Sequence, residues 1–323
     1  MRKTLAAIFL FGISSMPLSA FGLQLEVPLQ CEIGKSCWIQ QYADHDPTNG
    51  AADYTCGAET YDGHDGTDFR IPYLTSDVNV IAAAGGVVKA LRDGMEDRLA
   101  STPALLAAVK AAECGNGVVI AHEDGFETQY CHMKKDSIAV KPGQQIAAGD
   151  LLGKVGYSGA AAFPHVHLSV RHNGEKIDPF SGPVVQDCHA SQISLWSKAA
   201  AAALSYKSPS LIEIGWAQQA VSDEMIEHGS LAGLAPAANW PAVVGYARLI
   251  NLKQSDVVAL SAFSPAGEIA HSQQVLDRSK AQYLIYAGQK AHEPWPVGGY
   301  RIILKVTRDG KDILAQESFA TIK

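Results

Sequence analysis

Three groups of histidines, widely spaced along the chain, carry the residue types that metal-assisted hydrolysis needs. The first is the run His64-Asp65-Gly66-Thr67-Asp68, in which a histidine and an aspartate stand four residues apart with a glycine between them. Imidazole nitrogen and carboxylate oxygen both bind zinc at about 2.0–2.2 Å, and the glycine lets the chain turn both side chains toward one point. By itself the run is equally consistent with an ordinary turn.

The second and third groups are His165-Val166-His167 and the single His132. Residues two apart on a β-strand face the same side, so both imidazoles of the H-x-H run are expected to point to one place. One imidazole could then bind a metal while the other takes part in the reaction. His132 ends a β-like run, and a single histidine there is also consistent with a structural role.

Taken together and in chain order, these groups resemble the active-site motifs of the lysostaphin/LytM-type zinc metalloendopeptidases, the peptidoglycan endopeptidases of the duplicated hybrid motif fold. The similarity covers about residues 60–180. It includes Gly115-Asn116-Gly117-Val118-Val119-Ile120, Val155-Gly156-Tyr157-Ser158-Gly159 and the turn from Pro142 to Asp150.

The resemblance implies a role for five residues. His64, Asp68 and His167 would hold Zn²⁺, and His132 and His165 would be the catalytic histidines that orient water, move protons or stabilise the oxyanion. Three protein ligands leave a fourth position for water, whose pKa zinc lowers to about 7. The sequence leaves open which of the two catalytic histidines has which role.

The chain departs from the usual family pattern beside the H-x-H motif. The family usually has Thr-Gly-Pro-His there and an aromatic residue afterwards, whereas this chain has Ala161-Ala162-Phe163-Pro164 before the motif and Leu168 after it. These changes bear on the substrate groove, and an insertion at residues 93–114 is a further candidate groove wall. His122 could support the site or simply pack, and His45 and His172 are expected at the surface.

The resemblance implies an enzyme that hydrolyses amide bonds in peptidoglycan stem or cross-link peptides through a zinc-activated water. One alternative is a non-catalytic LytM-type regulator or activator of cell-wall amidases. A second is an enzyme that cuts ordinary protein, such as a Gly-rich matrix protein. The presence of all five site residues favours the enzyme. Peptidoglycan peptides are the expected partners, with a cell-wall or protein partner of the C-terminal region as a further hypothesis.

The first 22 residues have the anatomy of a signal peptide. Arg2 and Lys3 precede the apolar run from Leu5 to Ile13, and Ala20-Phe21-Gly22 fits a small-x-small cleavage site. The run is too short to span a bilayer, and no later stretch approaches about 20 apolar residues. We therefore expect an exported protein without a membrane span after signal removal. It would be periplasmic or extracellular, and the periplasm is favoured.

Six cysteines follow this segment, and an even number in an exported chain predicts disulfide bonds. Cys31 and Cys37 could close a short local loop, although six cysteines allow 15 pairings in all. A thiolate metal site is disfavoured because the chain has no C-x-x-C pair. The formal charge of −7 and the lack of a Lys/Arg run disfavour nucleic-acid binding.

The sequence predicts that the elements that position the histidines are mostly β-strands, which gives an all-β fold. Residues 60–190 are expected to form a two-sheet LytM-type domain, preceded by an N-terminal extension at 23–59 that either packs on the surface or restrains the site. Thr102-Pro103 predicts the start of a helix within the insertion. The Asp124-Gly125 pair predicts a hairpin turn. The expected strands are Val78–Ala84, Gly86–Leu91, Gly117–His122, Glu127–His132 and Val166–Arg171.

A connector at residues 191–206 leads to a second β-rich region, residues 207–323. Short alternating strands at this spacing predict an Ig-like β-sandwich. It could bind a cell-wall glycan or a partner, or serve as a spacer. The expected strands are Leu211–Ala217, Val243–Leu252, Val257–Phe263, Gln282–Tyr286, Tyr300–Thr307 and Asp312–Phe319.

Overall fold

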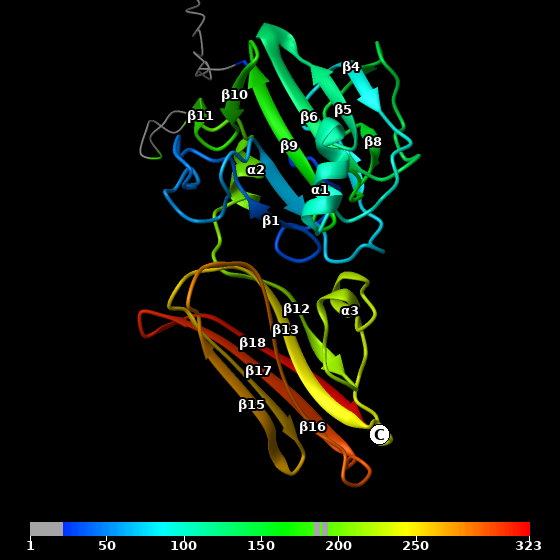
Figure 1. The fold of residues 1–323 in the computed structure, drawn as a ribbon, viewed down its shortest axis with the longest axis vertical. Helices are drawn as coiled ribbons and strands as arrows, with labels where there is room; N and C mark the ends of the chain where they lie inside the picture. The colour runs from blue at the N-terminus through cyan, green and yellow to red at the C-terminus, as the bar shows by residue number, and fades with distance from the viewer. Residues whose placement is uncertain (1–21, 184–187, 189–192) are drawn as a thin grey trace, which may run out of the picture.

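A computed structural model of the chain describes residues 22–183, 188 and 193–323. The expected signal peptide, residues 1–22, lies outside the described residues except for Gly22. The described chain forms two β-rich domains, which lie one above the other in Figure 1 with the connector between them. Within these residues, no helix is long and apolar enough to cross a membrane.

The first domain is built on a nine-stranded antiparallel sheet, and a two-stranded sheet lies beside it. The order in the large sheet is β1 (Trp38–Gln41), β2 (Thr67–Arg70), β9 (His165–His172), β6 (Phe126–Met133), β5 (Asn116–Ala121), β4 (Gly86–Arg92) and β7 (Gln145–Ile146). Off this path, β10 (Glu175–Asp178) pairs with β9, and β11 (Gly182–Pro183) pairs with β10. The small sheet pairs β3 (Asn79–Ile81) with β8 (Leu151–Lys154).

The five strands expected in this domain are all present, and β3 is the one that is clearly shorter than predicted. Strand β2 was not predicted, because its Thr-Asp-Phe-Arg sequence is mostly polar and has no apolar alternation. All four of its residues are nevertheless buried, since the strand lies between β1 and β9 near the edge of the sheet. Burying polar side chains costs free energy unless they are paired. Positions that break the usual apolar pattern in this way are often functional sites.

The insertion contains the expected helix, α1 (Pro103–Val109), followed by a 3₁₀ turn, η1 (Lys110–Ala112). Thr102 caps it by accepting a hydrogen bond from the Leu105 amide at 3.3 Å, with proline in the first turn. The chain before the helix packs on the segment that precedes the H-x-H motif: the Ala100 amide donates to the Ala161 carbonyl at 2.7 Å. The Asp124-Gly125 turn also forms, inside η2 (Glu123–Gly125).

Residues 23–59 are built into the first domain. Strand β1 pairs with β2, and Leu25, Leu29 and Tyr42 belong to the same buried core as the sheet. The expectation that the cysteines form disulfides is confirmed: the bonds are Cys31–Cys37, Cys56–Cys188 and Cys114–Cys131. The second bond ties this N-terminal part to the end of the domain.

The second domain is a sandwich of two antiparallel sheets, as predicted for residues 207–323, and the Ig-like assignment stays a prediction. A short helix, α2 (Lys198–Ala203), lies in the connector, and α3 (Asp223–Glu227) lies between the first two strands. One sheet has the order β12 (Ser210–Ala217), β13 (Ala242–Leu252) and β16 (Lys280–Lys290). The other has the order β15 (Gly267–Val275), β14 (Val257–Ser264), β17 (Gly298–Arg308) and β18 (Lys311–Ile322).

The core of this sandwich is apolar, with Leu249, Leu260, Ile302 and Leu304 all fully buried. Strand β15 was not predicted, because it is a largely exposed edge strand whose polar residues do not alternate with apolar ones. Helix α3 was also not predicted, although Ser222 caps it through the Met225 amide.

Candidate metal centre

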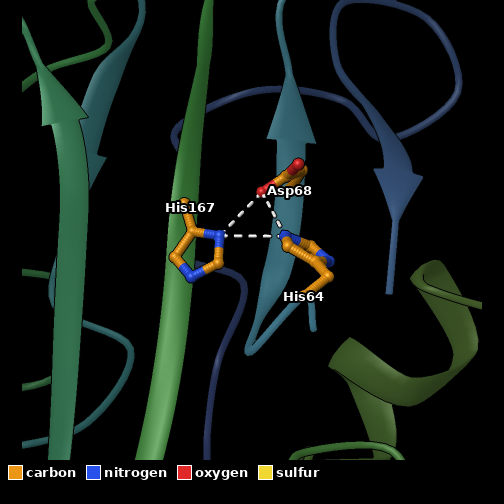
Figure 2. A group of neighbouring side chains, drawn as sticks. All are labelled: His64, Asp68 and His167. Carbon is orange, nitrogen blue, oxygen red and sulfur yellow. Dashed lines mark hydrogen bonds and ion pairs between the residues drawn. The ribbon is translucent and has the colours of Figure 1, made fainter. Parts of the chain in front are cut away.

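The pairing of β2 with β9 brings the first and second histidine groups together. In this antiparallel register Asp68 lies directly opposite His167, and Arg70 lies opposite His165. Opposite side chains on neighbouring strands have Cβ atoms about 5 Å apart, so the register alone places a carboxylate beside an imidazole. His64 reaches the same point from the loop that leads into β2, as Figure 2 shows.

Three potential ligand atoms converge at this point. His64 Nε2 lies 3.1 Å from Asp68 Oδ1 and 3.1 Å from His167 Nδ1, and His167 Nδ1 lies 2.9 Å from Asp68 Oδ1. Three atoms about 3 Å apart can all lie about 2 Å from one point, which is the distance of zinc from nitrogen and oxygen ligands. All three residues are buried, and together they form a group able to hold a metal ion.

A hydrogen bond to the backbone fixes which nitrogen of the His64 ring faces the point where the three ligand atoms converge. His64 Nδ1 lies 2.6 Å from the Tyr42 carbonyl oxygen. Because a carbonyl only accepts, Nδ1 must carry the proton, and the Nε2 lone pair faces Asp68 and His167. Tyr42 belongs to the N-terminal part of the chain, so that segment helps to orient a candidate ligand.

Asp65 and Ser169 hold the far side of the His167 ring. Its Nε2 lies 3.0 Å from Asp65 Oδ1 and 2.9 Å from Ser169 Oγ. A carboxylate behind a metal-binding histidine fixes its tautomer and raises its basicity. The sequence reading did not assign this role to Asp65, although its place inside the H-x-G-x-D run was a signal.

Gly66 is required at its position because the chain passes very close to β9. A Cβ atom there would lie 2.5 Å from the Leu168 carbonyl oxygen and 2.6 Å from His167 Nε2. No side chain fits in that space without displacing the candidate ligand. The glycine of the motif therefore acts through close approach of the backbone rather than through an unusual backbone angle.

The electrostatics of the trio favour a bound cation. Burial raises the pKa of the Asp68 carboxyl, but the nearby His64 and His165 outweigh that effect and hold it well below its usual range. Burial likewise lowers the pKa of His167, but its hydrogen bonds with Asp65 and Asp68 outweigh this and raise the pKa to about 9. Without a metal, this site stabilises positive charge in the form of a proton.

His132 and His165 form a second pair beside the trio, with ring centroids 4.6 Å apart. His132 Nδ1 donates to the Ser158 carbonyl at 2.8 Å, and His165 Nδ1 donates to the Phe163 carbonyl at 2.8 Å. Both Nε2 atoms are therefore left without a proton in the neutral form. His165 Nε2 lies 3.5 Å from Asp68 Oδ1, which places this pair next to the candidate ligands.

Burial lowers the pKa of both imidazoles in the second pair. For His132 the lowering is large, because His165 and His167 add to the effect of burial. His132 also adopts a left-handed backbone conformation, with φ 61°, at the end of β6. Such a conformation is uncommon for a residue with a side chain and occurs often at functional sites.

A cavity of ≈ 260 Å³ opens over the His167 side of the centre. Tyr61, which is 54% exposed, lines this cavity and packs at a tilt against the His64 ring, with ring centroids 4.5 Å apart. The other residues that line it come from β6, β9, the end of the insertion and the loops before β2 and β9: Asp65, Glu113, Cys114, Gln129, Cys131, His132, Ala160, His167, Ser169 and Arg171.

The three other histidines that the structure describes in this domain lie elsewhere. The expectation of an exposed His45 was wrong: its side chain is buried, and Nε2 lies 2.8 Å from Asp178 Oδ2. His122 contacts the Gly85 carbonyl and the Thr128 hydroxyl, at 2.7 and 2.8 Å. His172 is half-buried and stacks on Phe126, so it is less exposed than expected.

Comparison with known proteins gives one family. Residues 62–179 match the model of Peptidase family M23. The DD-carboxypeptidase/endopeptidase Mpg of Neisseria meningitidis serogroup B is 37% identical over 67 residues, which are 21% of this chain and 15% of that protein. The peptidoglycan DD-endopeptidase ShyA of Vibrio cholerae is 30% identical over 115 residues, 36% of this chain and 22% of that protein.

Among solved structures, the catalytic domain of lysostaphin from Staphylococcus simulans is 22% identical, covering 43% of this chain and 85% of that domain, with a TM-score of 0.28. The matched part spans less than a quarter of the length of the Mpg and ShyA proteins. Residues 62–179, which match the family model, contain all five predicted site residues. Over the domain that carries the candidate metal centre, the chain thus resembles Peptidase family M23.

Proposed function

We propose that this chain is a zinc metalloendopeptidase that hydrolyses amide bonds in peptidoglycan stem or cross-link peptides. The observation that carries the proposal is the buried convergence of His64 Nε2, Asp68 Oδ1 and His167 Nδ1, with two more imidazoles beside them. Two imidazoles and a carboxylate are a donor set that zinc accepts, and they leave a coordination position open.

The three candidate ligands meet the requirements for a cation as they stand. The single N–H of neutral His64 donates its hydrogen bond to the Tyr42 carbonyl, and that of neutral His167 can donate to Asp65 or Ser169. The lone pairs of both rings and of the Asp68 carboxylate then face one point. A positive ion bound there would offset the negative charge of the carboxylate and the repulsion between the lone pairs. A bound zinc ion would supply the Lewis acidity that activates water and polarises the scissile carbonyl.

His132 and His165 are the proposed proton carriers. Their Nδ1 atoms are engaged with backbone carbonyls, so each Nε2 lone pair can accept a proton from the attacking water. The lowered pKa values keep both rings neutral before the reaction. The ring that has taken the water proton can then stabilise the oxyanion, and it can donate the same proton to the leaving amide nitrogen.

The choice of peptidoglycan as substrate rests on the names of the relatives and on the setting of the chain. ShyA is named a peptidoglycan DD-endopeptidase, and Mpg a DD-carboxypeptidase/endopeptidase. Three disulfide bonds are typical of an exported protein. We propose export through a signal peptide at residues 1–22 to the periplasm, where peptidoglycan peptides are available.

The proposal is tested by digestion of purified sacculi beside a gel of ordinary protein, with zinc-loaded protein and a His132→Gln variant. We expect soluble muropeptides from the sacculi and no clearing of the protein gel. Mass analysis of the muropeptides identifies the bond, because each endopeptidase leaves its own new termini. Clearing of the protein gel without muropeptide release would contradict the proposed substrate.

A non-catalytic regulator is the second candidate. The Cell division protein DipM of Caulobacter vibrioides is 40% identical over 58 residues, 18% of this chain and 9% of that protein. This function predicts that the protein changes the activity of a cell-wall amidase while releasing no muropeptide alone. The complete set of five site residues is the observation that ranks it below the enzyme.

A further inference from the structure

Three charged side chains meet across the boundary between the two domains. Arg70 lies on β2 of the first domain, Glu227 ends α3 of the second, and Arg248 lies on β13. Arg70 Nη2 donates to both carboxylate oxygens of Glu227 at 3.0 Å. Arg248 also pairs with Glu227, and it donates to the Pro72 carbonyl at 3.1 Å. In Figure 1, α3 lies at the end of the sandwich that faces the first domain.

The same Arg70 side chain contacts the active-site half of the first domain. Its guanidinium carbon lies 4.8 Å from the centre of the Phe163 ring, within the range of a cation–π contact. Phe163 in turn stacks on His165, with ring centroids 4.4 Å apart, and its carbonyl accepts the His165 Nδ1 proton. Glu227, Arg70, Phe163 and His165 are thus connected by direct contacts from one domain to the other.

The Arg70 side chain has no exposed surface, so its position depends on its partners. Besides Glu227, it donates to Gln40 Oε1 at 2.7 Å. Loss of the carboxylate would leave two guanidinium groups close together with their shared counter-ion removed, and they would repel each other. The Arg70 plane would then shift against the Phe163 ring. Phe163 would carry that shift to the imidazole, because both its ring and its carbonyl touch His165.

Phe163 is also a residue in which this chain departs from the usual Thr-Gly-Pro-His pattern. An aromatic ring there gives His165 a neighbour that a glycine cannot supply. The insertion packs on the same segment, through the Ala100 and Ala161 backbone hydrogen bond. The surroundings of His165 are therefore built from parts of this chain outside the shared motifs.

We propose that Glu227 of the second domain is a positioning residue for His165, acting through Arg70 and Phe163, so that the sandwich domain completes the active site. This inference rests on the proposed function for its effect on catalysis. The contact path itself can be tested without any turnover. A purely structural ion pair, which only holds the domains together, predicts a different result in the same experiment.

The test uses the zinc-loaded full chain and NMR of its histidine rings, with the His165 signal assigned by its loss in a His165→Gln variant. The Phe163 ring current shifts this signal, so Phe163→Leu gives the value for a lost stack. We expect Glu227→Gln to move the signal toward that value. Glu224→Gln is the matched control, because Glu224 is an exposed residue of the same short helix, and it should leave the signal in place.

Kinetics on isolated muropeptides provide the second readout. We expect Glu227→Gln to lower kcat by about 10- to 100-fold with little change in KM, because small misplacements of a reacting group cost this much. Combining it with Phe163→Leu should add little, since both changes act through one path. Glu227→Asp keeps the charge, so it should retain more activity, and it serves as the second variant if Glu227→Gln folds poorly.

The outcomes separate the inference from the proposed function. An unchanged His165 signal in Glu227→Gln, with a lower melting temperature, would overturn the inference and leave an ion pair that only joins the domains. Additive losses in the double variant would also overturn it. A shifted signal in a protein that cleaves no muropeptide would contradict the proposed function and support the positioning role.

Discussion

The two domains differ in what they bury. The first buries imidazoles, carboxylates and a guanidinium, among them His64, Asp68 and His165. The sandwich has an apolar interior, and the described residues of β12 to β18 include only three buried polar side chains: Arg248, Asn251 and Asp256. Buried polar groups cost free energy unless they are paired, so their distribution marks where the molecule has a use for them.

The three exceptions in the sandwich lie at or near the junction. Arg248 contacts Glu227 and the Pro72 carbonyl, and Asn251 donates to Glu59 Oε2 at 2.8 Å. Asp256 pairs with Arg308, whose guanidinium also donates to the carbonyl of Ser208, just after the connector. Buried polar groups are therefore concentrated in the first domain and, within the sandwich, at or near its junction with that domain.

The largest effect should come from the metal centre itself. Asp68→Asn keeps the shape of the side chain and removes the charge that binds the cation. A loss of about 4 kcal/mol of transition-state stabilisation corresponds to about 10³-fold in rate. We therefore expect at least that loss of muropeptide release, together with lower zinc content by elemental analysis. Asp309→Asn, in the exposed turn between the last two strands, is the control and should retain both.

A change in the apolar core of the sandwich should alter stability without altering chemistry. Leu260 is fully buried, and Leu260→Ala is expected to lower the free energy of unfolding by about 2–5 kcal/mol. Urea unfolding measures this effect, and zinc content should stay at the wild-type level under native conditions. The same change at Leu106, which is 45% exposed in the insertion, should cost much less. Zinc loss in Leu260→Ala would break the division between the domains.

At the junction between the domains, a change at Glu59 should alter the pH dependence of the free energy of unfolding, by an amount similar to or smaller than the effect of Leu260→Ala. Burial raises the pKa of Glu59 from 4.5 to about 7. The folded state therefore holds a proton that the unfolded state has released, and Glu59 makes the protein less stable as pH rises from about 4.5 to 7. We expect Glu59→Gln to gain up to about 3 kcal/mol on the wild type across this window. A constant difference between the two unfolding curves at pH 4.5 and pH 8 would argue against it.

The smallest effect in this series is the change in zinc affinity expected on removal of the Asp65 carboxylate, which contacts the far side of the His167 ring. Asp65→Asn removes the carboxylate that lies 3.0 Å from His167 Nε2 and leaves all three candidate ligands in place. We expect the apparent dissociation constant for zinc to rise by about 10- to 100-fold, with about one zinc still bound at saturation. A competition titration with a zinc chelator measures this. Unchanged affinity would show that Ser169 alone orients the ring.

The sequence was most informative where chemistry and pattern coincided. His64, Asp68 and His167 were predicted from residue type and the resemblance; the β2–β9 register brings Asp68 and His167 together, and His64 joins them from the loop before β2. Strands with clear apolar patterns, such as β6 and β13, were predicted nearly to their ends. Periodicity works there because one face or both faces of the strand must be buried.

The contacts that orient the site were not predictable from the same pattern. Asp65, Tyr42 and Phe163 act through single hydrogen bonds or ring contacts, which no periodicity encodes. The buried pair of His45 and Asp178 joins residues far apart in sequence, so His45 read as a surface residue. Glu227 reads as an ordinary polar residue of a short helix until the packing of the two domains is known.

The most direct measurement is zinc content and sacculus digestion of the mature protein beside a His167→Ala variant. We predict about one zinc per wild-type chain, in line with a three-ligand site, and soluble muropeptides that are lost with the metal in the variant. A wild-type protein that binds no zinc and releases no muropeptide would contradict the metallopeptidase proposal. Equal digestion by the variant would contradict the role of His167 in the metal centre.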